Sequence, residues 1–579
     1  MSHTFTLWAP LAEQVDCVAA HHPQAMERVD HGWWRCTVAD AGPGTRYRFA
    51  VDGSPPLADP RSPSQPLGVS GPSEVVDHGA FAWGDRGWRG LPLAGAVLYE
   101  LHVGTFTAAG TFDAVIERLP HLVELGIDAI ELLPVAEFSG DRGWGYDGVY
   151  LFAPHHAYGG PDGLRRLVDA AHGAGIGVVM DVVYNHFGPQ GGDICRFGPY
   201  LTDRHTTNWG DAVNFDDAGS DEVRAFVVDN ALMWLRDYHC DGLRLDAVHA
   251  IVDQSATHVL EQLGGAVDAL AAHVRRHLFL IAESDRNDPR LVHSRDAGGY
   301  GLDAAWADDW HHALHAVMTG DESGYYADFG PLTMLAKALR QAWVYDGSWS
   351  AHRRRVHGRR PTAISGGQLV VSTQNHDQVG NRALGERLGA LTTTGRLKVA
   401  AALLLTGPFT PMLFQGEEWA AATAFQYFTH HDDPDLGRAV CQGRRQEFAD
   451  FGWDPDTVPD PQDVATFERS KLDWSELSSP PHDAMLAWYR DLIALRRRVP
   501  ALSDPRLDAV EVACDEAAGW LTVRRGPITV MASVAATELR LDLAGVMRVV
   551  LASAPSVRLH ARALALPPDS VAILQQTGP

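Results

Sequence analysis

The spacing of hydrophobic and polar positions changes character twice along the chain. Over the first ninety or so residues, short aromatic and β-branched runs such as GWWRCTVAD and TRYRFAVDG alternate with Gly, Pro and Asp turns, which predicts β-strands. From GAVLYELHVGTF onward, apolar strand-like runs alternate with helical patterns such as SDEVRAFVVDNALMWLRDYH. After about residue 500 short strands return, among them WLTVRRG and ITVMASV. The pattern predicts a β-rich start, an α/β middle and a β-rich end.

The α/β middle contains eight candidate strands, most of them separated by a helical pattern. They are AVLYELHV, AIELLPV, GVVMDVVY, GLRLDAV, LFLIAES, GLDAAWAD, LVVSTQNHD and PMLFQGEE. Eight β/α units predict an α/β fold of the (β/α)8 TIM-barrel type. We expect an N-terminal β-sandwich at residues 1–90, the barrel at 91–498, and a small antiparallel β domain at 499–579. Pro120 should kink or split its predicted helix.

Composition and charge narrow the class of protein. The chain has 579 residues, too many for a single compact core. Its formal net charge of −25 argues against nucleic acid or an anionic membrane as a partner. The six cysteines are scattered without metal-ligand spacing, and neither a signal peptide nor a membrane-spanning run is evident. We therefore expect a cytoplasmic protein with reduced thiols.

Polar side chains follow four of the predicted barrel strands, at the point where each strand ends. In chain order they are Asp181, Asn185 and His186; Arg244, Asp246 and His249; Glu283; and Asn375, His376 and Asp377. The carboxyl ends of all barrel strands meet at one rim, where active sites of this fold lie. Three carboxylates, those of Asp246, Glu283 and Asp377, can therefore converge there.

Three converging carboxylates beside an arginine suit the cleavage of an acetal. One carboxylate attacks the anomeric carbon while a protonated carboxylic acid donates to the leaving oxygen. Arg244 shares a strand face with Asp246 and would keep it ionised, whereas drier surroundings would raise the pKa of Glu283. Taken alone, the Arg244 and Asp246 pair could be a structural ion pair, and the other motifs a turn or a helix start. Four such motifs in register favour a site.

The motifs DVVYNH, GLRLDAVH, IAES and NHD resemble, in order and separation, the four motif regions of the α-amylase family of glycoside hydrolases. The resemblance implies that Asp246 is the nucleophile, Glu283 the general acid/base and Asp377 the transition-state stabiliser. It also implies a set of residues that shape the subsite of the attacked sugar: Tyr146, Asp181, His186, Arg244 and His376.

Three further stretches resemble the trehalose-releasing members of this family: WADDWHHALHAVMTGDESGYYADFG, TQNHDQVGNRALGERL and PDPQDVATFERSKLDW. The resemblance covers nearly the whole chain, including an N-terminal sandwich of the glycogen-branching and debranching type. It implies cleavage of the α-1,4 bond next to the trehalose end of maltooligosyltrehalose. It also implies a pathway partner, maltooligosyltrehalose synthase. No residue pattern in the chain requires a cofactor. We expect additional sugar contacts from His249, Asp308, Asp309, His311, His312, Gln378 and Asn381, with a surface helix start as the alternative for the DDWHH stretch.

The chain departs from starch-hydrolysing amylases at two places. The segment 187–220 is too short for a large calcium-binding excursion and has no dense carboxylate loop. No metal is expected, although Asn185 lies where many amylases bind calcium. His249-Ala250 stands where a typical amylase has Lys-His. A glycogen branching or debranching enzyme is the nearest alternative function. A catalytically inactive glucan-binding protein is the alternative of another class.

Overall fold

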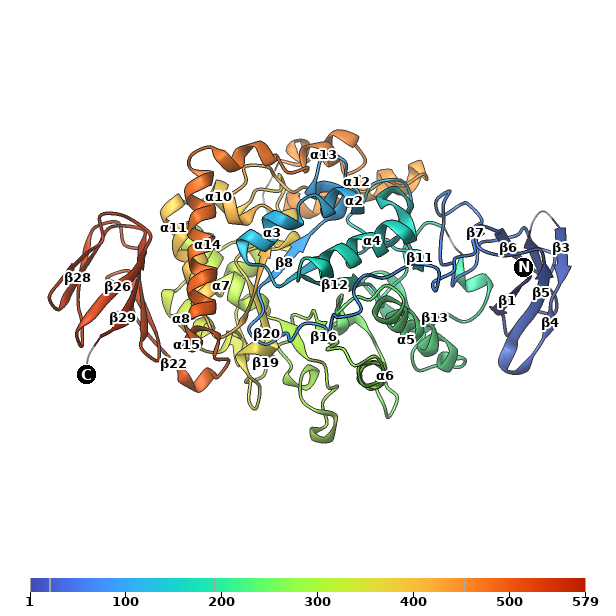
Figure 1. Cartoon of the computed structure of the whole chain (residues 1–579), viewed down its shortest axis with the longest axis horizontal. Coiled ribbons are helices and arrows are strands. Elements are labelled where there is room, and N and C mark those ends of the chain that lie inside the picture. The colour runs from blue at the N-terminus through green and yellow to red at the C-terminus, as the bar shows by residue number, and fades with distance from the viewer. Residues whose placement is uncertain (1, 20–21, 192, 451–453, 578–579) are drawn as a thin grey trace.

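The computed structural model describes residues 2–19, 22–191, 193–450 and 454–577. Figure 1 shows two β-rich ends separated by a large α/β body, with the N-terminal strands at one end of the long axis and the C-terminal strands at the other. This arrangement follows the two changes of hydrophobic periodicity along the chain.

The N-terminal part consists of two antiparallel sheets that pack on each other. One has the order β1-β5-β4 and the other β3-β2-β6-β7. The strands are β1 (Ser2–Trp8), β2 (Val15–Ala19), β3 (His22–Ala25), β4 (Glu27–Arg28), β5 (Trp33–Ala39), β6 (Arg46–Val51) and β7 (Ser73–Glu74). Alternate side chains point between the sheets, where the Phe5 and Tyr47 rings lie 4.7 Å apart.

The middle of the chain forms a closed barrel of eight parallel strands, and all eight strand predictions are confirmed. The strands are β8 (Leu98–Leu101), β9 (Ala129–Leu132), β12 (Gly177–Val182), β15 (Gly242–Leu245), β16 (Phe279–Ala282), β17 (Ala304–Trp306), β20 (Leu369–Ser372) and β21 (Thr410–Phe414). Their order around the barrel is β12-β15-β16-β17-β20-β21-β8-β9. Because every strand is covered by helices on its outer face, the strands read as continuous apolar runs rather than alternating ones.

Helices surround the barrel. They are α1 (Val103–Phe106), α2 (Phe112–Ile116), α3 (Leu119–Leu125), α4 (Gly160–Gly173), α5 (Ser220–Arg236), α6 (Val259–Val274), α7 (Asp308–Thr319), α8 (Leu332–Gln341), α9 (His376–Gly380), α10 (Leu388–Leu391), α11 (Thr394–Thr406), α12 (Pro434–Asp450), α13 (Val464–Arg469), α14 (His482–Arg498) and α15 (Pro500–Ser503). Pro120 splits its predicted helix as expected: α2 ends before it, and it occupies the first turn of α3, where a missing N–H costs nothing.

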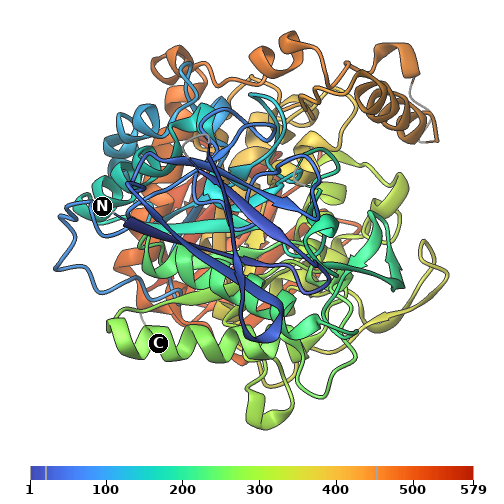
Figure 2. The ribbon, with the colours of Figure 1, turned by 90° about the vertical axis from the view of Figure 1, so that its right-hand side faces the viewer.

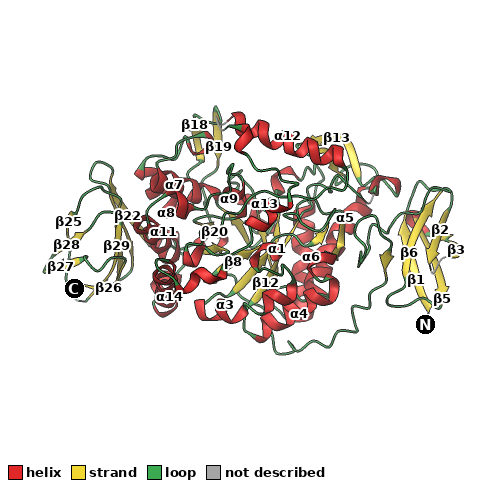
Figure 3. Ribbon diagram, turned by 90° about the horizontal axis from the view of Figure 1, so that it is seen from above, coloured by secondary structure: helices red, strands yellow, loops and turns green. Residues whose placement is uncertain are grey.

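Insertions between strands and helices extend from one side of the barrel. The segment 187–220 carries the hairpin β13 (Leu201–Thr207) with β14 (Gly210–Val213), and a second hairpin pairs β18 (Asp346–Ser350) with β19 (Arg355–Gly358). The short strands β10 (Ala136–Glu137) and β11 (Tyr150–Pro154) also pair. In Figures 2 and 3 both hairpins and helix α12 lie on the same side of the molecule.

The C-terminal part is antiparallel, as predicted. A five-stranded sheet has the order β22-β23-β24-β29-β26, and a three-stranded sheet the order β25-β28-β27. The strands are β22 (Val510–Asp515), β23 (Trp520–Arg525), β24 (Ile528–Ser533), β25 (Leu539–Asp542), β26 (Met547–Ala552), β27 (Arg558–His560), β28 (Ala563–Leu566) and β29 (Ser570–Gln576). Nowhere in the described ranges does a helix combine the length and apolar character needed to cross a membrane.

Candidate active site

Arg244, 2% exposed, is the centre of a charged network at the carboxyl ends of the barrel strands. Its Nη1 donates to Asp181 Oδ2 and to Asp246 Oδ1, both at 2.8 Å. Its Nη2 lies 3.7 Å from Glu283 Oε2. The three carboxylates come from, or directly follow, the adjacent strands β12, β15 and β16. A buried guanidinium needs such partners, because an unpaired buried charge is strongly unfavourable.

Asp246 is held from both sides, although it lies just beyond the regular strand. Strand β15 ends at Leu245, and Ala247 adopts a left-handed backbone with φ of 41°. The expected strand alternation therefore stops one residue before Asp246. The carboxylate still meets Arg244 through Oδ1, while its Oδ2 accepts a hydrogen bond of 2.8 Å from Asn185 Nδ2. Both oxygens are thus fixed in one orientation.

Glu283 is placed to keep its proton. It follows β16 directly, and its Oε2 accepts the backbone N–H of Ala247 at 2.6 Å. Burial raises the pKa of Glu283 well above its ordinary value; Arg244 opposes this shift, and the neighbouring carboxylates of Asp246, Asp308 and Asp377 reinforce it. A carboxyl group with a raised pKa beside an ionised one is the arrangement needed for general acid catalysis.

A second chain of hydrogen bonds runs across the barrel from Asp181 to Glu100. Tyr146 OH donates to Asp181 Oδ2 and lies 2.7 Å from His376 Nε2. His376 Nδ1 in turn lies 2.6 Å from Glu100 Oε1. Burial lowers the pKa of His376, but the Glu100 carboxylate more than offsets this, so the pKa of the imidazole is raised. Sequence reasoning missed Glu100 because it lies inside an apolar strand motif, not at its end.

His186 forms the edge of the same site. Its Nε2 bonds to the Tyr146 carbonyl at 3.0 Å, and its ring stacks on that of Trp209 at 4.7 Å. Trp209 lies between β13 and β14 and remains 47% exposed, so its indole offers a flat apolar surface beside the carboxylates. Trp209 was not predicted from sequence. His249 is half-buried nearby, and its carbonyl accepts a hydrogen bond from Arg286.

The DDWHH stretch forms the first turn of α7, and its polar side chains have different partners. Asp308 lies near Glu283 and Asp377: burial and then Asp377 raise the pKa of Asp308 to about 7. Asp309 Oδ2, however, accepts the backbone N–H groups of Val344 and Tyr345. Both ring nitrogens of His311 bond to the protein, at Thr373 O and Tyr326 OH, and His312 Nδ1 lies within hydrogen-bond distance of Asp308 O.

Asp309 and His311 thus direct their hydrogen-bonding atoms to the protein itself. Both residues are buried at the start of the helix. Their hydrogen-bonding atoms are used to attach neighbouring loops, because buried polar groups require internal partners.

The residues around Asp377 cap a short helix. Asn375 accepts the N–H groups of Asp377 and Gln378 at the start of α9, and Gln378 Oε1 accepts the Asn375 N–H at 3.1 Å. This reciprocal capping occupies the Gln378 carbonyl. Asn381 instead donates from Nδ2 to Asp377 Oδ1 at 2.5 Å. The structure thus places Gln378 in the cap and brings Asn381 to the Asp377 carboxylate.

A different group of potential metal ligands lies away from these carboxylates. The ligand atoms of Glu137, His155 and His156 lie within 4.8 Å of one another. His155 Nδ1 accepts the N–H of Ala157, so in the neutral ring the proton is on Nε2. Metal binding at Nε2 would therefore require the proton to move to Nδ1 and the hydrogen bond from Ala157 to be lost. Glu137 and His156 instead form a hydrogen bond of 2.7 Å.

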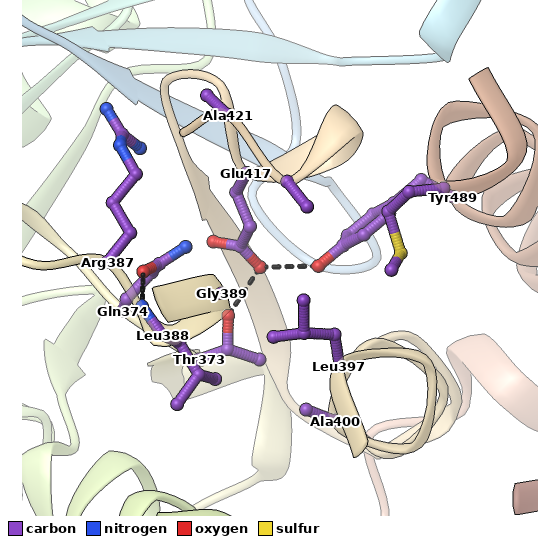
Figure 4. Close-up of a pocket in the computed structure, with 12 residues that line it drawn as sticks. Thr373, Gln374, Arg387, Leu388, Gly389, Leu397, Ala400, Glu417, Ala421 and Tyr489 are labelled. Carbon is purple, nitrogen blue, oxygen red and sulfur yellow. Dashed lines mark hydrogen bonds between the residues drawn. The ribbon is translucent and has the colours of Figure 1, made fainter. Parts of the chain in front are cut away.

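A small cavity is lined by residues that follow β20 and β21, among them Thr373 and Glu417, and Figure 4 shows its lining. Glu417 extends from the β21 side toward Thr373 and Tyr489, and its carboxylate accepts hydrogen bonds from both hydroxyls and from Phe414 N–H. Burial raises the pKa of Glu417 to about 7. Since this carboxyl group is satisfied by the protein, the cavity is part of the packing around the barrel.

Comparison with known proteins shows which families this chain resembles. A sequence model of the alpha amylase catalytic domain matches residues 83–192. The malto-oligosyltrehalose trehalohydrolase of Arthrobacter ramosus is 54% identical over 535 residues, 92% of this chain and 92% of that protein. The enzyme of the same name from Rhizobium sp. (strain M-11) is 50% identical over 580 residues, 99% of this chain and 97% of that protein. A crystal structure described as a putative alpha amylase from Salmonella typhimurium is 39% identical with a TM-score of 0.91, and covers 99% of this chain and 98% of its own.

Proposed function

The chain belongs to the malto-oligosyltrehalose trehalohydrolases of the α-amylase family, and we propose that it cleaves the α-1,4-glucosidic bond next to the trehalose end of maltooligosyltrehalose. It is a glycoside hydrolase acting in trehalose formation. The proposed products are trehalose and a shortened maltooligosaccharide. The observation that carries the proposed chemistry is the Arg244 network, which joins three carboxylates from adjacent strands within hydrogen-bond or ion-pair reach.

In this proposal Asp246 is the nucleophile. Arg244 and Asn185 each hold one of its oxygens at 2.8 Å, which fixes the carboxylate in the orientation proposed for attack on the anomeric carbon. Attack breaks the bond to the leaving oxygen and forms a covalent glycosyl intermediate. Because Asp246 is already oriented, little conformational freedom has to be lost in reaching the transition state.

Glu283 is the proposed general acid and base. Its raised pKa keeps the proton available for the oxygen of trehalose as it leaves. The resulting carboxylate then takes a proton from water, whose oxygen attacks the intermediate and releases the glucan with retained configuration. Asp377 is proposed to hold sugar hydroxyls while the ring flattens.

The network of Tyr146, Asp181, His376 and Glu100 is proposed to shape the subsite of the attacked sugar. The His376 ring is held by Glu100 at 2.6 Å and by the Tyr146 hydroxyl at 2.7 Å. The proposal is that these side chains are already oriented before the sugar binds. A site that is organised in advance lowers the cost of ordering substrate and protein together. His186, His249 and Asp308 are proposed to contact the sugar from the rim.

A product analysis tests the proposed substrate. The protein is incubated with maltotriosyltrehalose and, in parallel, with maltohexaose, and the products are separated by chromatography. We expect trehalose plus maltotriose from the first and almost no reaction with the second. Transfer products from maltohexaose would instead indicate a branching activity, and equal hydrolysis of both would remove the preference for a trehalose end.

Two substitutions test the residue roles. Asp246→Ala and Glu283→Gln should each abolish turnover with an unchanged melting profile, and the exposed Glu511 supplies a control, Glu511→Gln, that should leave turnover unchanged. Near-normal activity of either site variant would remove that residue from the mechanism. Binding of glucan by the unmodified protein without any product would favour the inactive-scaffold alternative.

We also propose that residues 1–90, 91–498 and 499–579 are separate domains, and that the first has a carbohydrate-binding-like role. Limited proteolysis tests the domain boundaries. Glucan-affinity electrophoresis of the full chain tests the binding role. We further propose that the protein is located in the cytoplasm and that maltooligosyltrehalose synthase supplies its substrate. Cell fractionation tests the location, and loss of trehalose formation from linear maltooligosaccharides on omission of the synthase from a two-enzyme mixture tests the supply.

A further inference from the structure

Arg444, on helix α12 (Pro434–Asp450), reaches from this outer helix to the loop that follows the catalytic-rim helix α9. Its Nη1 donates to Asn381 Oδ1 at 2.8 Å, and its Nη2 donates to the carbonyl of Gly380. The guanidinium carbon lies 4.8 Å from the ring centre of Tyr427 and 4.7 Å from that of Phe448. Two hydrogen bonds and two aromatic rings hold the side chain in one position.

Asn381 connects Arg444 to Asp377 through two hydrogen bonds of its side-chain amide. An arginine N–H can only donate, so the Asn381 atom that meets Arg444 must be the amide oxygen. This choice turns the amide nitrogen toward Asp377, where Nδ2 donates to Oδ1. Without the guanidinium, the Asn381 amide loses the partner that holds its oxygen, and its nitrogen can leave Asp377 for solvent. Arg444 therefore holds the amide in the position from which its nitrogen reaches Asp377.

The neighbouring carboxylates of the site are held differently. Asp246 and Glu283 are fixed by groups on or directly after barrel strands, namely Arg244, Asn185 and the Ala247 N–H. Asp377 is more exposed, and within the described ranges its carboxylate receives a side-chain hydrogen bond from Asn381. Its orientation thus depends on a helix outside the barrel, which lies on the same side of the molecule as the two rim hairpins (Figure 3).

We propose that Arg444 is a positioning residue that orients Asp377 through Asn381 and Gly380. This inference rests on the proposed role of Asp377 in the transition state. If Asp377 gains its sugar contacts mainly as the ring flattens, its misorientation weakens the transition state more than the bound substrate, so kcat falls more than KM rises.

The test compares Arg444→Ala and Arg444→Lys with Arg438→Ala, a matched control on the same helix whose side chain is exposed and pairs with Asp435. We expect kcat of Arg444→Ala to fall by about 10- to 100-fold, in line with the cost of small misplacements at active sites, with KM changed by less than about threefold. Arg444→Lys should be impaired as well, because an ammonium does not reproduce the planar fork that meets Asn381 and Gly380 together. Arg438→Ala should match the unmodified enzyme.

Two further readouts separate positioning from general destabilisation. Added guanidinium ion should restore part of the kcat of Arg444→Ala. The double variant Asn381→Ala/Arg444→Ala should be no slower than the worse single variant, because both act through one carboxylate. Normal kcat in Arg444→Ala or Arg444→Lys, or fully additive losses in the double variant, would overturn the inference. If Arg444→Ala does not fold, Arg444→Lys decides it.

Asp377→Ala distinguishes failure of this inference from failure of the proposed function. An inactive Asp377→Ala beside a normal Arg444→Ala would leave the catalytic role of Asp377 standing and remove only the role of Arg444. An active Asp377→Ala would remove the proposed role of Asp377, and the inference with it.

Discussion

Replacing Glu417 by glutamine should make the protein more stable at alkaline pH. Glu417 is 5% exposed and lies in the cavity of Figure 4. The substitution is nearly isosteric and keeps every hydrogen bond. The amide oxygen can accept the Phe414 N–H, while the amide N–H groups donate to the hydroxyls of Thr373 and Tyr489, which accept as well as donate.

The magnitude follows from the pKa of Glu417, which burial raises from 4.5 to about 7. Below pH 4.5 the carboxyl group is protonated in both the folded and the unfolded chain, so it contributes no pH dependence. Between pH 4.5 and 7 the unfolded chain releases the proton and the folded chain retains it, so stability falls by up to about 1.4 kcal/mol per pH unit. Above pH 7 the loss is complete and amounts to about 3 kcal/mol. Glutamine does not titrate, and Glu417→Gln should escape this loss.

Urea denaturation at pH 4.5, 6 and 8 provides the measurement. The variant and the unmodified protein should have similar midpoints at pH 4.5, and the variant should gain progressively up to pH 8. The exposed Glu511→Gln serves as a control for the loss of one carboxylate and should show no such gain. Parallel stability curves for Glu417→Gln and the unmodified protein would refute the reasoning, because they would mean that Glu417 is ionised equally in both states.

Three other predictions follow from the buried charges. Arg244→Met should cost about 3–5 kcal/mol of stability, because it leaves Asp181 buried and uncompensated, and should abolish turnover; a native unfolding midpoint would contradict this. Glu131 is buried with no partner for either carboxylate oxygen among the described residues, and burial raises its pKa; Glu131→Gln should therefore gain stability as pH rises above about 4.5, and an unchanged pH slope would exclude a retained proton. Asp308→Asn removes one carboxylate that raises the pKa of Glu283, so the alkaline limb of kcat/KM should move to lower pH; no movement would separate that limb from Glu283.

The barrel strands could be predicted because each is a continuous apolar run bounded by turn residues, which is what burial on both faces demands. The rim residues could be predicted for the same reason: Asp181, Arg244 and Glu283 interrupt or directly follow such runs, where an unpaired charge would be costly. The resemblance of the four motifs then named the chemistry. For these residues, the position relative to the end of an apolar strand is enough to predict a place on the rim of the barrel.

Other parts of the site have no local signal. Glu100 lies within an apolar strand motif, and its partner His376 comes from the opposite part of the chain. The DDWHH stretch suggests a set of sugar ligands from sequence. In the structure, Asp309 and His311 instead form hydrogen bonds to Val344 and Thr373, which are far from them in the chain. Trp209 and Arg444 lie in inserted segments without barrel periodicity, so nothing in their neighbourhood indicates that they reach the rim.

The sequence by itself determined the number and order of the strands, the side of the barrel on which the polar groups emerge, and the family to which the motifs point. Hydrophobic periodicity and strand ends depend on residues that are close together in the chain, so they can be recognised from the sequence alone. Only the tertiary structure decided which carboxylates share Arg244, which polar side chains hold loops, and how α12 reaches the loop beside Asp377. These outcomes depend on hydrogen bonds between residues far apart in the chain, whose directions are set by the closed barrel and by the packing of its insertions.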